Sequence, residues 1–185
     1  MPEEKETTLV TIKLVGDLVQ QGFQVTVEIG LEDQRPFTEG VGTLPSDAEL
    51  SETWQAWRES YHRLKNPTRI RPLEISYHGS IHRQVDRCVQ QAQTFQQRFR
   101  HWLAAPSFSA LNQLLREELN RTESIRVVIR TDNLCLQLMP WHLWDLIDRY
   151  PLAEVGLTPL SSQRLRQRPN TVKDDVLTRC SNRPA

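Results

Sequence analysis

Cysteine is scarce in this sequence, and the few cysteines are scattered. The three are Cys88, Cys135 and Cys180, an odd number with no CxxC spacing among them. Such a set excludes a disulfide framework and a cysteine-based zinc site. The chain has 185 residues, which is enough to bury a core without either. Unpaired cysteines suit a reducing compartment, so we expect a cytoplasmic protein.

Net charge and long apolar runs are absent as well. Lys and Arg number 23 and Asp and Glu number 23, so no overall field draws the chain to nucleic acid or to an anionic membrane. No run approaches the roughly 18 apolar residues that span a bilayer. The opening residues, MPEEKETT, lack the apolar core of a signal peptide. We therefore expect neither nucleic acid nor a membrane as a partner.

Patterns that bind cofactors or metals are also missing. Gly40 and Gly42 lack the lysine and the helix start of a phosphate-binding loop. His78 and His82 have the spacing of two ligands on one helical face, but a helix only begins between them and no third ligand is evident. The sequence therefore predicts no cofactor and no metal site.

Alternating β-branched residues open the chain. Residues 8–15 and 22–30 alternate apolar and polar side chains with a period of two, which predicts two strands with one wet face. Gly16 and Gly22 bracket the segment between them, which indicates a hairpin with a longish loop. Residues 31–45 contain two prolines and two glycines and are typical of a loop or a short edge strand.

Helical and strand patterns then alternate along the chain. Spacings of three and four predict helices over 46–64, 80–104, 107–119 and 140–148, and further strands are predicted over 71–77, 125–130 and 153–158. Ser46 and Glu49 form a capping box for the first helix. The alternation predicts an α/β fold, a mixed sheet with flanking helices. We expect one domain over 1–160 and a polar, Arg-rich, disordered tail over 161–185.

Cys135 and His78 have the outline of a caspase-like pair, in which a histidine ends one strand and a cysteine ends a later one. The thiolate is the nucleophile in such a pair, and the histidine takes its proton. However, Pro72 breaks the strand before His78. Residues 133–136 have the pattern of a strand in which Cys135 fills an apolar or edge position. The residues favour a packed cysteine and a turn histidine, with a cysteine peptidase as the alternative.

Two tryptophan pairs invite comparison with nucleotide-stacking platforms. Trp54 and Trp57 lie on the apolar face of a predicted helix, and Trp141 and Trp144 can share one face of another. Proteins that bind single strands combine such rings with a basic groove. No basic groove accompanies either pair, and the arginines of 164–168 lie in the polar tail. Both pairs are therefore interpreted as core residues.

One block of sequence resembles a known family. Residues 125–158 contain Arg130-Thr131, then Leu138-Met-Pro-Trp141, then His142-Leu-Trp-Asp145, then Tyr150-Pro-Leu-Ala-Glu-Val155. This order is similar to a block of cyanobacterial CHAT-domain proteins, which are caspase-like and often fused to a CHASE2 region. Segments 14–17, 21–26 and 79–81 resemble the opening of the same proteins. The resemblance covers roughly residues 8–160.

The resemblance implies a scaffold without reactive groups. Its motif residues here are Pro140, Trp141, Leu143, Trp144, Asp145, Tyr150 and Pro151. Pro140 is expected to start a short helix that packs its tryptophans on the sheet, with Asp145 near the helix start. In the family the catalytic histidine and cysteine follow this block, so they carry over to no residue of this chain, and the catalytic site is predicted to be none.

The expected function follows from that absence. We expect a non-catalytic regulatory or protein-interaction module related to CHAT proteins, and a truncated gene copy is one form of this hypothesis. The alternative is a caspase-like cysteine peptidase that uses Cys135 and His78. The partner would be a CHAT-domain relative or a second copy of the chain. Because the family sheet continues beyond this block, we expect an unpaired edge and some uncovered apolar surface.

Overall fold

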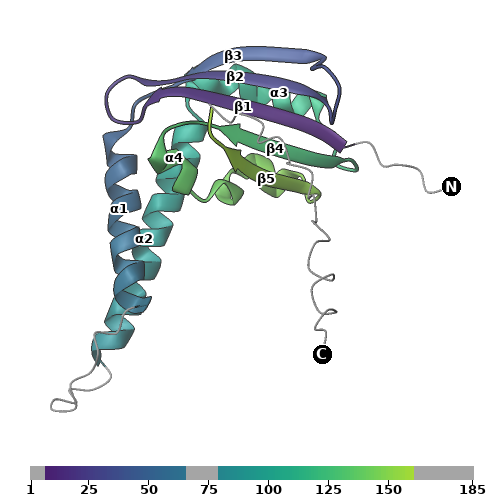
Figure 1. The fold of residues 1–185 in the computed structure, drawn as a ribbon. Coiled ribbons are helices and arrows are strands. Elements are labelled where there is room, and N and C mark those ends of the chain that lie inside the picture. Colours follow the sequence, from purple (N-terminus) through teal and green to yellow (C-terminus); the bar gives the residue numbers. More distant parts are fainter. Residues whose placement is uncertain (1–6, 66–78, 161–185) are drawn as a thin grey trace, which may run out of the picture.

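The computed structural model describes residues 7–65 and 79–160 (Figure 1). These residues form one five-stranded sheet in the order β3-β2-β1-β4-β5. The strands are β1 (Thr7–Asp17), β2 (Gly22–Leu31), β3 (Thr38–Leu44), β4 (Ser124–Arg130) and β5 (Ala153–Thr158). β1, β2 and β3 pair antiparallel, whereas β4 and β5 run parallel to β1. The predicted mixed α/β sheet is confirmed; the predicted strand at 71–77, His78 and the tail lie outside the described residues.

The hairpin of β1 and β2 supplies the centre of the core. Ile12 pairs with Val27 and Leu14 pairs with Val25, and all four side chains are at most 2% exposed. The alternate residues lie on the other face of the sheet, where polar side chains remain in contact with water. At the turn, Gly16 has a φ of +146°, and a Cβ there would lie 2.1 Å from the Gly22 carbonyl oxygen. The turn therefore requires glycine.

Residues 31–45 were predicted to form a loop or a short edge strand. The structure has an edge strand there, β3. Gly40 and Gly42 are part of β3. Helix α3 (Ser109–Glu118) packs closely against the β3 backbone at these two positions, which favours glycine there. A Cβ at Gly40 would lie 2.7 Å from side-chain carbons of Leu111 and Leu114. A larger residue at Gly40 would therefore require the ends of these two leucine side chains to shift. A 3-10 turn, η1 (Pro106–Phe108), precedes α3 and has a proline at its first position, where no amide donor is needed.

Two long helices form a hairpin that projects beyond the sheet (Figure 1). They are α1 (Ala48–Lys65) and an unbroken α2 (Gly79–Leu103). The half of α2 next to the sheet buries its apolar residues more completely than the distal half: Phe99 is 0% exposed, whereas Val85 is 42% and Val89 is 49% exposed, although Cys88 between them is buried. The apolar spacing in the sequence continues along the whole of α2. The distal residues are more exposed because that half of the helix has only α1 to cover it.

The N-cap of α1 differs from the prediction. Asp47, rather than Ser46, accepts the capping hydrogen bond, from the Leu50 amide to Oδ1 at 2.9 Å. Arg98 of α2 also binds the Asp47 carboxylate. A hydroxyl could not hold both the amide and the guanidinium in this way, so the contact between helices selects the aspartate.

Two predictions between β4 and β5 are wrong. Residues 134–138 form a short helix, α4 (Leu134–Leu138), instead of a strand, because the Asn133 side chain accepts hydrogen bonds from the amides of Cys135 and Leu136. The predicted helix 140–148 is split into the 3-10 turn η2 (Trp141–Leu143) and α5 (Asp145–Arg149). Pro140 precedes η2 instead of starting it. Trp144, with an extended ψ of 130°, separates the two pieces.

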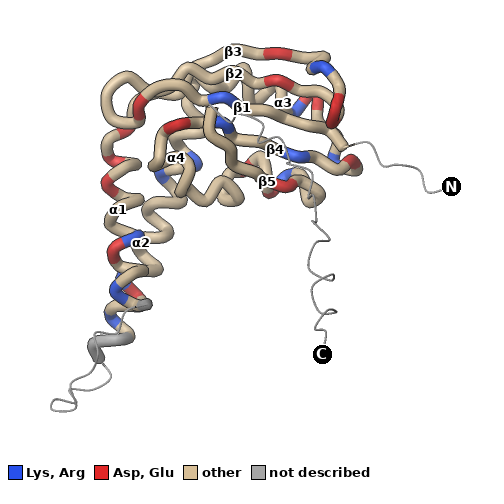
Figure 2. Tube along the Cα trace, viewed as in Figure 1, with Lys and Arg blue, Asp and Glu red and all other residues tan. Residues whose placement is uncertain are grey.

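Charge and hydropathy are unremarkable over the described residues. Acidic and basic residues both occur on the helical hairpin and on the sheet (Figure 2). None of the helices in residues 7–65 and 79–160 combines the length and the apolar character needed to cross a bilayer.

Candidate interaction site

The motif residues from Pro140 to Pro151 lie in the segment that connects β4 to β5. Its large aromatic residues are buried: Trp141 is 3%, Trp144 is 4% and Tyr150 is 3% exposed. Pro140 and Leu143 are half-buried, whereas Asp145 and Pro151 are exposed. The block therefore contributes packing and surface charge, and its aromatic rings are not accessible to a ligand.

Trp141 connects this block to the helices on either side. Its indole Nε1 donates a hydrogen bond to the Leu136 carbonyl at 2.8 Å, which satisfies the last turn of α4. Its ring meets Phe99 of α2 edge to face, with centroids 5.5 Å apart. Trp144 packs against Phe108, 6.0 Å away. These contacts hold α4 and η2 against α2.

Arg100 of α2 joins the same block through charge. Its guanidinium pairs with Asp145 at 2.9 Å and with Asp148 at 2.8 Å, and its Nε also donates to the Leu143 carbonyl at 3.0 Å. Asp145 was predicted to act on a helix dipole, and Arg100 was not predicted as its partner. No periodicity could have paired residues that lie 45 positions apart on separate helices.

A hydrogen-bonded corner closes the carboxyl ends of β4 and β5. The Thr131 amide donates to the Thr158 carbonyl at 3.2 Å, and the Gln137 side chain donates to the Thr131 carbonyl at 2.7 Å. Asp132 accepts from the Leu160 amide at 2.9 Å. In open α/β sheets ligands commonly bind at this end of the strands. Here the corner and α4 occupy that position.

Cys135 lies in this corner as a half-buried residue of α4. Burial raises the pKa of its thiol, and the opposing effects of a hydrogen bond with Ser51 and of the nearby Arg58 do not cancel it. A raised thiol pKa leaves little thiolate at neutral pH, which disfavours the nucleophile role. His78 lies outside the described residues, so its pairing with Cys135 stays a prediction.

The part of the chain that the structure describes contains no cluster of metal-binding side chains. No group of three or more His, Cys, Asp or Glu side chains converges there. His82, the described member of the predicted histidine spacing, is exposed on α2.

The outer edge of β5 is one of the two edges of the sheet, and the outer edge of β3 is the other. Within the described residues β5 pairs with β4 alone. The Ile125 amide donates to the Leu152 carbonyl at 3.3 Å, and the Thr131 amide donates to the Thr158 carbonyl at 3.2 Å. Parallel ladders alternate, so Leu157 turns its amide and carbonyl groups away from β4. The edge thus offers backbone groups to a further strand.

Exposed leucine side chains lie on β5 and on α4. Leu157 shares its strand face with Val155, which packs on the core, yet Leu157 is 47% exposed. On α4, which follows β4 directly, Leu134 is 73% and Leu138 is 54% exposed. We call Leu134, Leu138 and Leu157 the leucine rim. A Cβ at Gly156 would meet no atom within 4 Å, so β5 is open on its other face too.

No protein-family model, curated protein or solved structure matches this chain. The fold and the site thus define a class only: a mixed α/β sheet whose last described strand is an open parallel edge.

Proposed function

We propose that this chain is a non-catalytic protein-interaction module of the CHAT type, which accepts a partner strand at the outer edge of β5. The observation that carries the proposal is the unpaired edge of a parallel strand among the described residues. Parallel sheets usually have their strands buried within α/β layers, and an exposed edge is a template for another chain.

Strand addition explains the arrangement of side chains at this edge. The outward backbone groups of β5 would supply the hydrogen bonds, and the leucine rim would supply apolar contacts beside them. Glu154 is the only charged side chain on β5, so charge does little to block the edge. In the family that residues 125–158 resemble, the chain continues from this block into the catalytic part. A CHAT-type relative, or a second copy of this chain, is accordingly the proposed partner.

The chemistry of the described residues supports a role without catalysis. Cys135 has a raised thiol pKa, and the resemblance carries no catalytic residue to this chain. Cys88, buried on α2, and Cys135 are both free thiols, which suits the cytoplasm as the proposed location.

Leu157→Pro tests the proposal directly. Proline removes the outward amide of β5 but leaves its pairing with β4, whereas Leu157→Ala keeps that amide as a matched control. Light scattering at micromolar concentration would measure self-association, and titration with a purified CHAT-type protein would measure the complex. We expect proline to weaken association by roughly tenfold more than alanine. A wild-type chain that remains monomeric and binds no CHAT-type protein would refute the proposal.

A further inference from the structure

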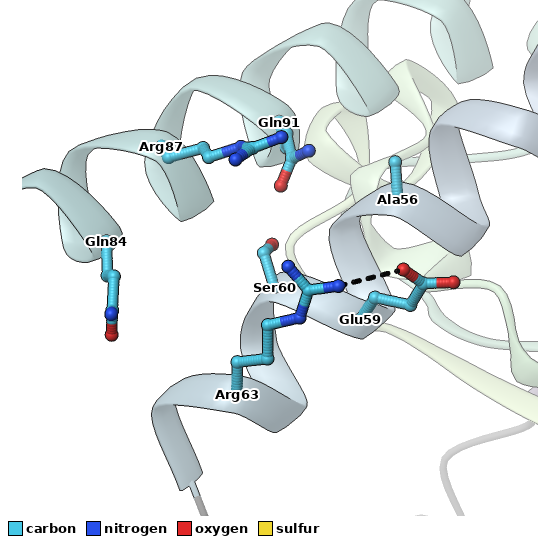
Figure 3. A pocket seen from close by; sticks show the side chains of 7 residues that line it. All are labelled: Ala56, Glu59, Ser60, Arg63, Gln84, Arg87 and Gln91. Carbon is cyan, nitrogen blue, oxygen red and sulfur yellow. Dashed lines mark ion pairs between the residues drawn. The ribbon is translucent and has the colours of Figure 1, made fainter. Parts of the chain in front are cut away.

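A cleft lined mainly by polar and charged residues lies between α1 and α2 (Figure 3). These two helices form the hairpin that projects beyond the sheet (Figure 1). Its volume is about 300 Å³, the lower end of the range for small-molecule sites. Glu59, Ser60 and Arg63 line it from α1, and Arg87 and Gln91 line it from α2. The cleft is remote in the fold from the β5 edge and does not depend on the function proposed for that edge.

The cleft exists because the filling of the hairpin changes along its length. Nearer the sheet, Trp57 and Phe95 stack with ring planes 4° apart and centroids 5.9 Å apart. On the side of α1 that lines the cleft, the residues are small: Ala56, which directly precedes Trp57, and Ser60, about one helical turn farther out. Small side chains opposite long polar ones leave a gap that no described side chain fills. The gap is therefore open instead of packed, and most of the residues that line it are polar or charged.

Positive charge predominates around the cleft. Arg63 pairs with Glu59 at 3.6 Å, but both side chains are about 70% exposed, so this pair is weak. Arg87 makes no ion pair with any residue that the structure describes. Two guanidinium groups on facing helices, opposed by one carboxylate, favour an oxyanion.

The same cleft also contains hydrogen-bond acceptors. Gln91 Oε1 is buried and has no hydrogen-bond partner among the described residues. The Ser60 hydroxyl donates to the Trp57 carbonyl at 2.8 Å, so only its lone pairs remain for a ligand. The terminal torsion of glutamine is soft, so the Gln91 oxygen can turn toward a donor in the cleft. A fully deprotonated anion would leave this oxygen without a donor.

We propose that the cleft binds a phosphate-class oxyanion that retains one proton. Its charged oxygens would accept hydrogen bonds from Arg87 and Arg63, and its P–OH group would donate to Gln91 or Ser60. Inorganic phosphate at neutral pH carries both kinds of group, whereas sulfate is similar in shape but has no proton to donate. The cleft therefore selects phosphate over sulfate.

Titrations of the full chain with inorganic phosphate and with sulfate, at constant ionic strength and pH 7, test this assignment. Amide shifts of Ser60 and Gln91 in NMR spectra report binding. We expect saturable phosphate binding and sulfate binding that is weaker by roughly tenfold, the cost of one unmade hydrogen bond. Gln91→Leu should reduce phosphate to the affinity of sulfate. Equal affinity for the two anions in the wild-type chain would overturn the assignment.

Arg87→Gln and Arg83→Gln form a matched pair. Both remove one positive charge from α2, one helical turn apart, but only Arg87 lines the cleft. We expect Arg87→Gln to weaken phosphate binding at least tenfold and Arg83→Gln to change it less than about twofold. Circular dichroism would check that both variants fold. Equal losses in both variants, or no saturable binding to the wild type, would show that the cleft is not a specific site.

Discussion

Arg98 on α2 binds Asp47, the N-cap of α1, through two hydrogen bonds: Nε to Oδ2 at 2.7 Å and Nη2 to Oδ1 at 2.8 Å. The Asp47 side chain is only 8% exposed, while Arg98 is 36% exposed. The carboxylate therefore caps one helix and anchors it to the other at the same time. This contact lies where the helical hairpin leaves the sheet, so it determines how the hairpin is attached.

Asp47→Ala should destabilise the fold through both of these roles. We expect a loss of about 2 kcal/mol in the free energy of unfolding, because a cap contributes about 1 kcal/mol and a bidentate pair with a partly exposed arginine a similar amount. Urea unfolding followed by circular dichroism measures it. Asp47→Asn keeps the cap and loses the charge, so it should lose about half as much. Equal stability of the alanine variant and the wild type would contradict this account.

The same carboxylate predicts how stability depends on pH. Burial alone would raise the pKa of Asp47, but hydrogen bonds from Arg98 and from the Leu50 and Glu49 amides, with the Arg98 charge, hold it below its usual range. A lowered pKa in the folded state stabilises the fold above the unfolded value near pH 4. That contribution is lost as the pH falls through the lower folded value.

Unfolding measurements between pH 7 and about pH 3 test this dependence. The wild-type chain should lose more stability over this range than Asp47→Asn, which has no carboxyl to protonate at that position. Parallel pH profiles of the two proteins would show that Asp47 does not contribute to the acid sensitivity.

Trp141→Phe should lower the free energy of unfolding more than Trp54→Phe does, although both indoles are buried. Trp141 Nε1 donates to the Leu136 carbonyl at 2.8 Å, whereas Trp54 Nε1 is buried without a partner among the described residues. The first substitution removes one of the two hydrogen bonds that the Leu136 carbonyl accepts, the other coming from the Met139 amide at 3.3 Å, and it should cost about 1 kcal/mol. The second substitution removes a buried donor that has no partner, so it should cost less. Thermal and urea unfolding compare the two. A larger loss for Trp54→Phe would reverse the interpretation.

Cys135 should react slowly with iodoacetamide at neutral pH. Burial raises its thiol pKa, so its thiolate fraction at pH 7 should be smaller than that of an unperturbed thiol with a pKa of about 8.5. The Ser51 hydrogen bond acts in the opposite direction, so Ser51→Ala should slow alkylation further. Peptide mapping by mass spectrometry separates Cys135 from the other cysteines. Fast alkylation, with peptidase activity that Cys135→Ala abolishes, would favour the peptidase alternative.

Local patterns predicted much of the fold but little of its surface chemistry. The long helix was predictable because its apolar spacing persists for 25 residues, longer than any competing signal. Asparagine is a preferred N-cap residue, so Asn133 could have indicated the start of α4. However, the leucines that follow it alternate with other residues, as they would in a strand. Five residues are too few for periodicity to distinguish the two.

The sequence by itself determined the β1–β2 hairpin and the inward face of each strand, because a period of two admits only one way to bury Ile12 and Val27. Only the tertiary structure decided which residues meet across long separations. Arg98 and Asp47 are 51 positions apart, and Arg100 and Asp148 are 48 apart. Such pairs, like the open edge of β5 and the cleft beside Arg87, arise from where whole elements end and cross, and no local pattern records that.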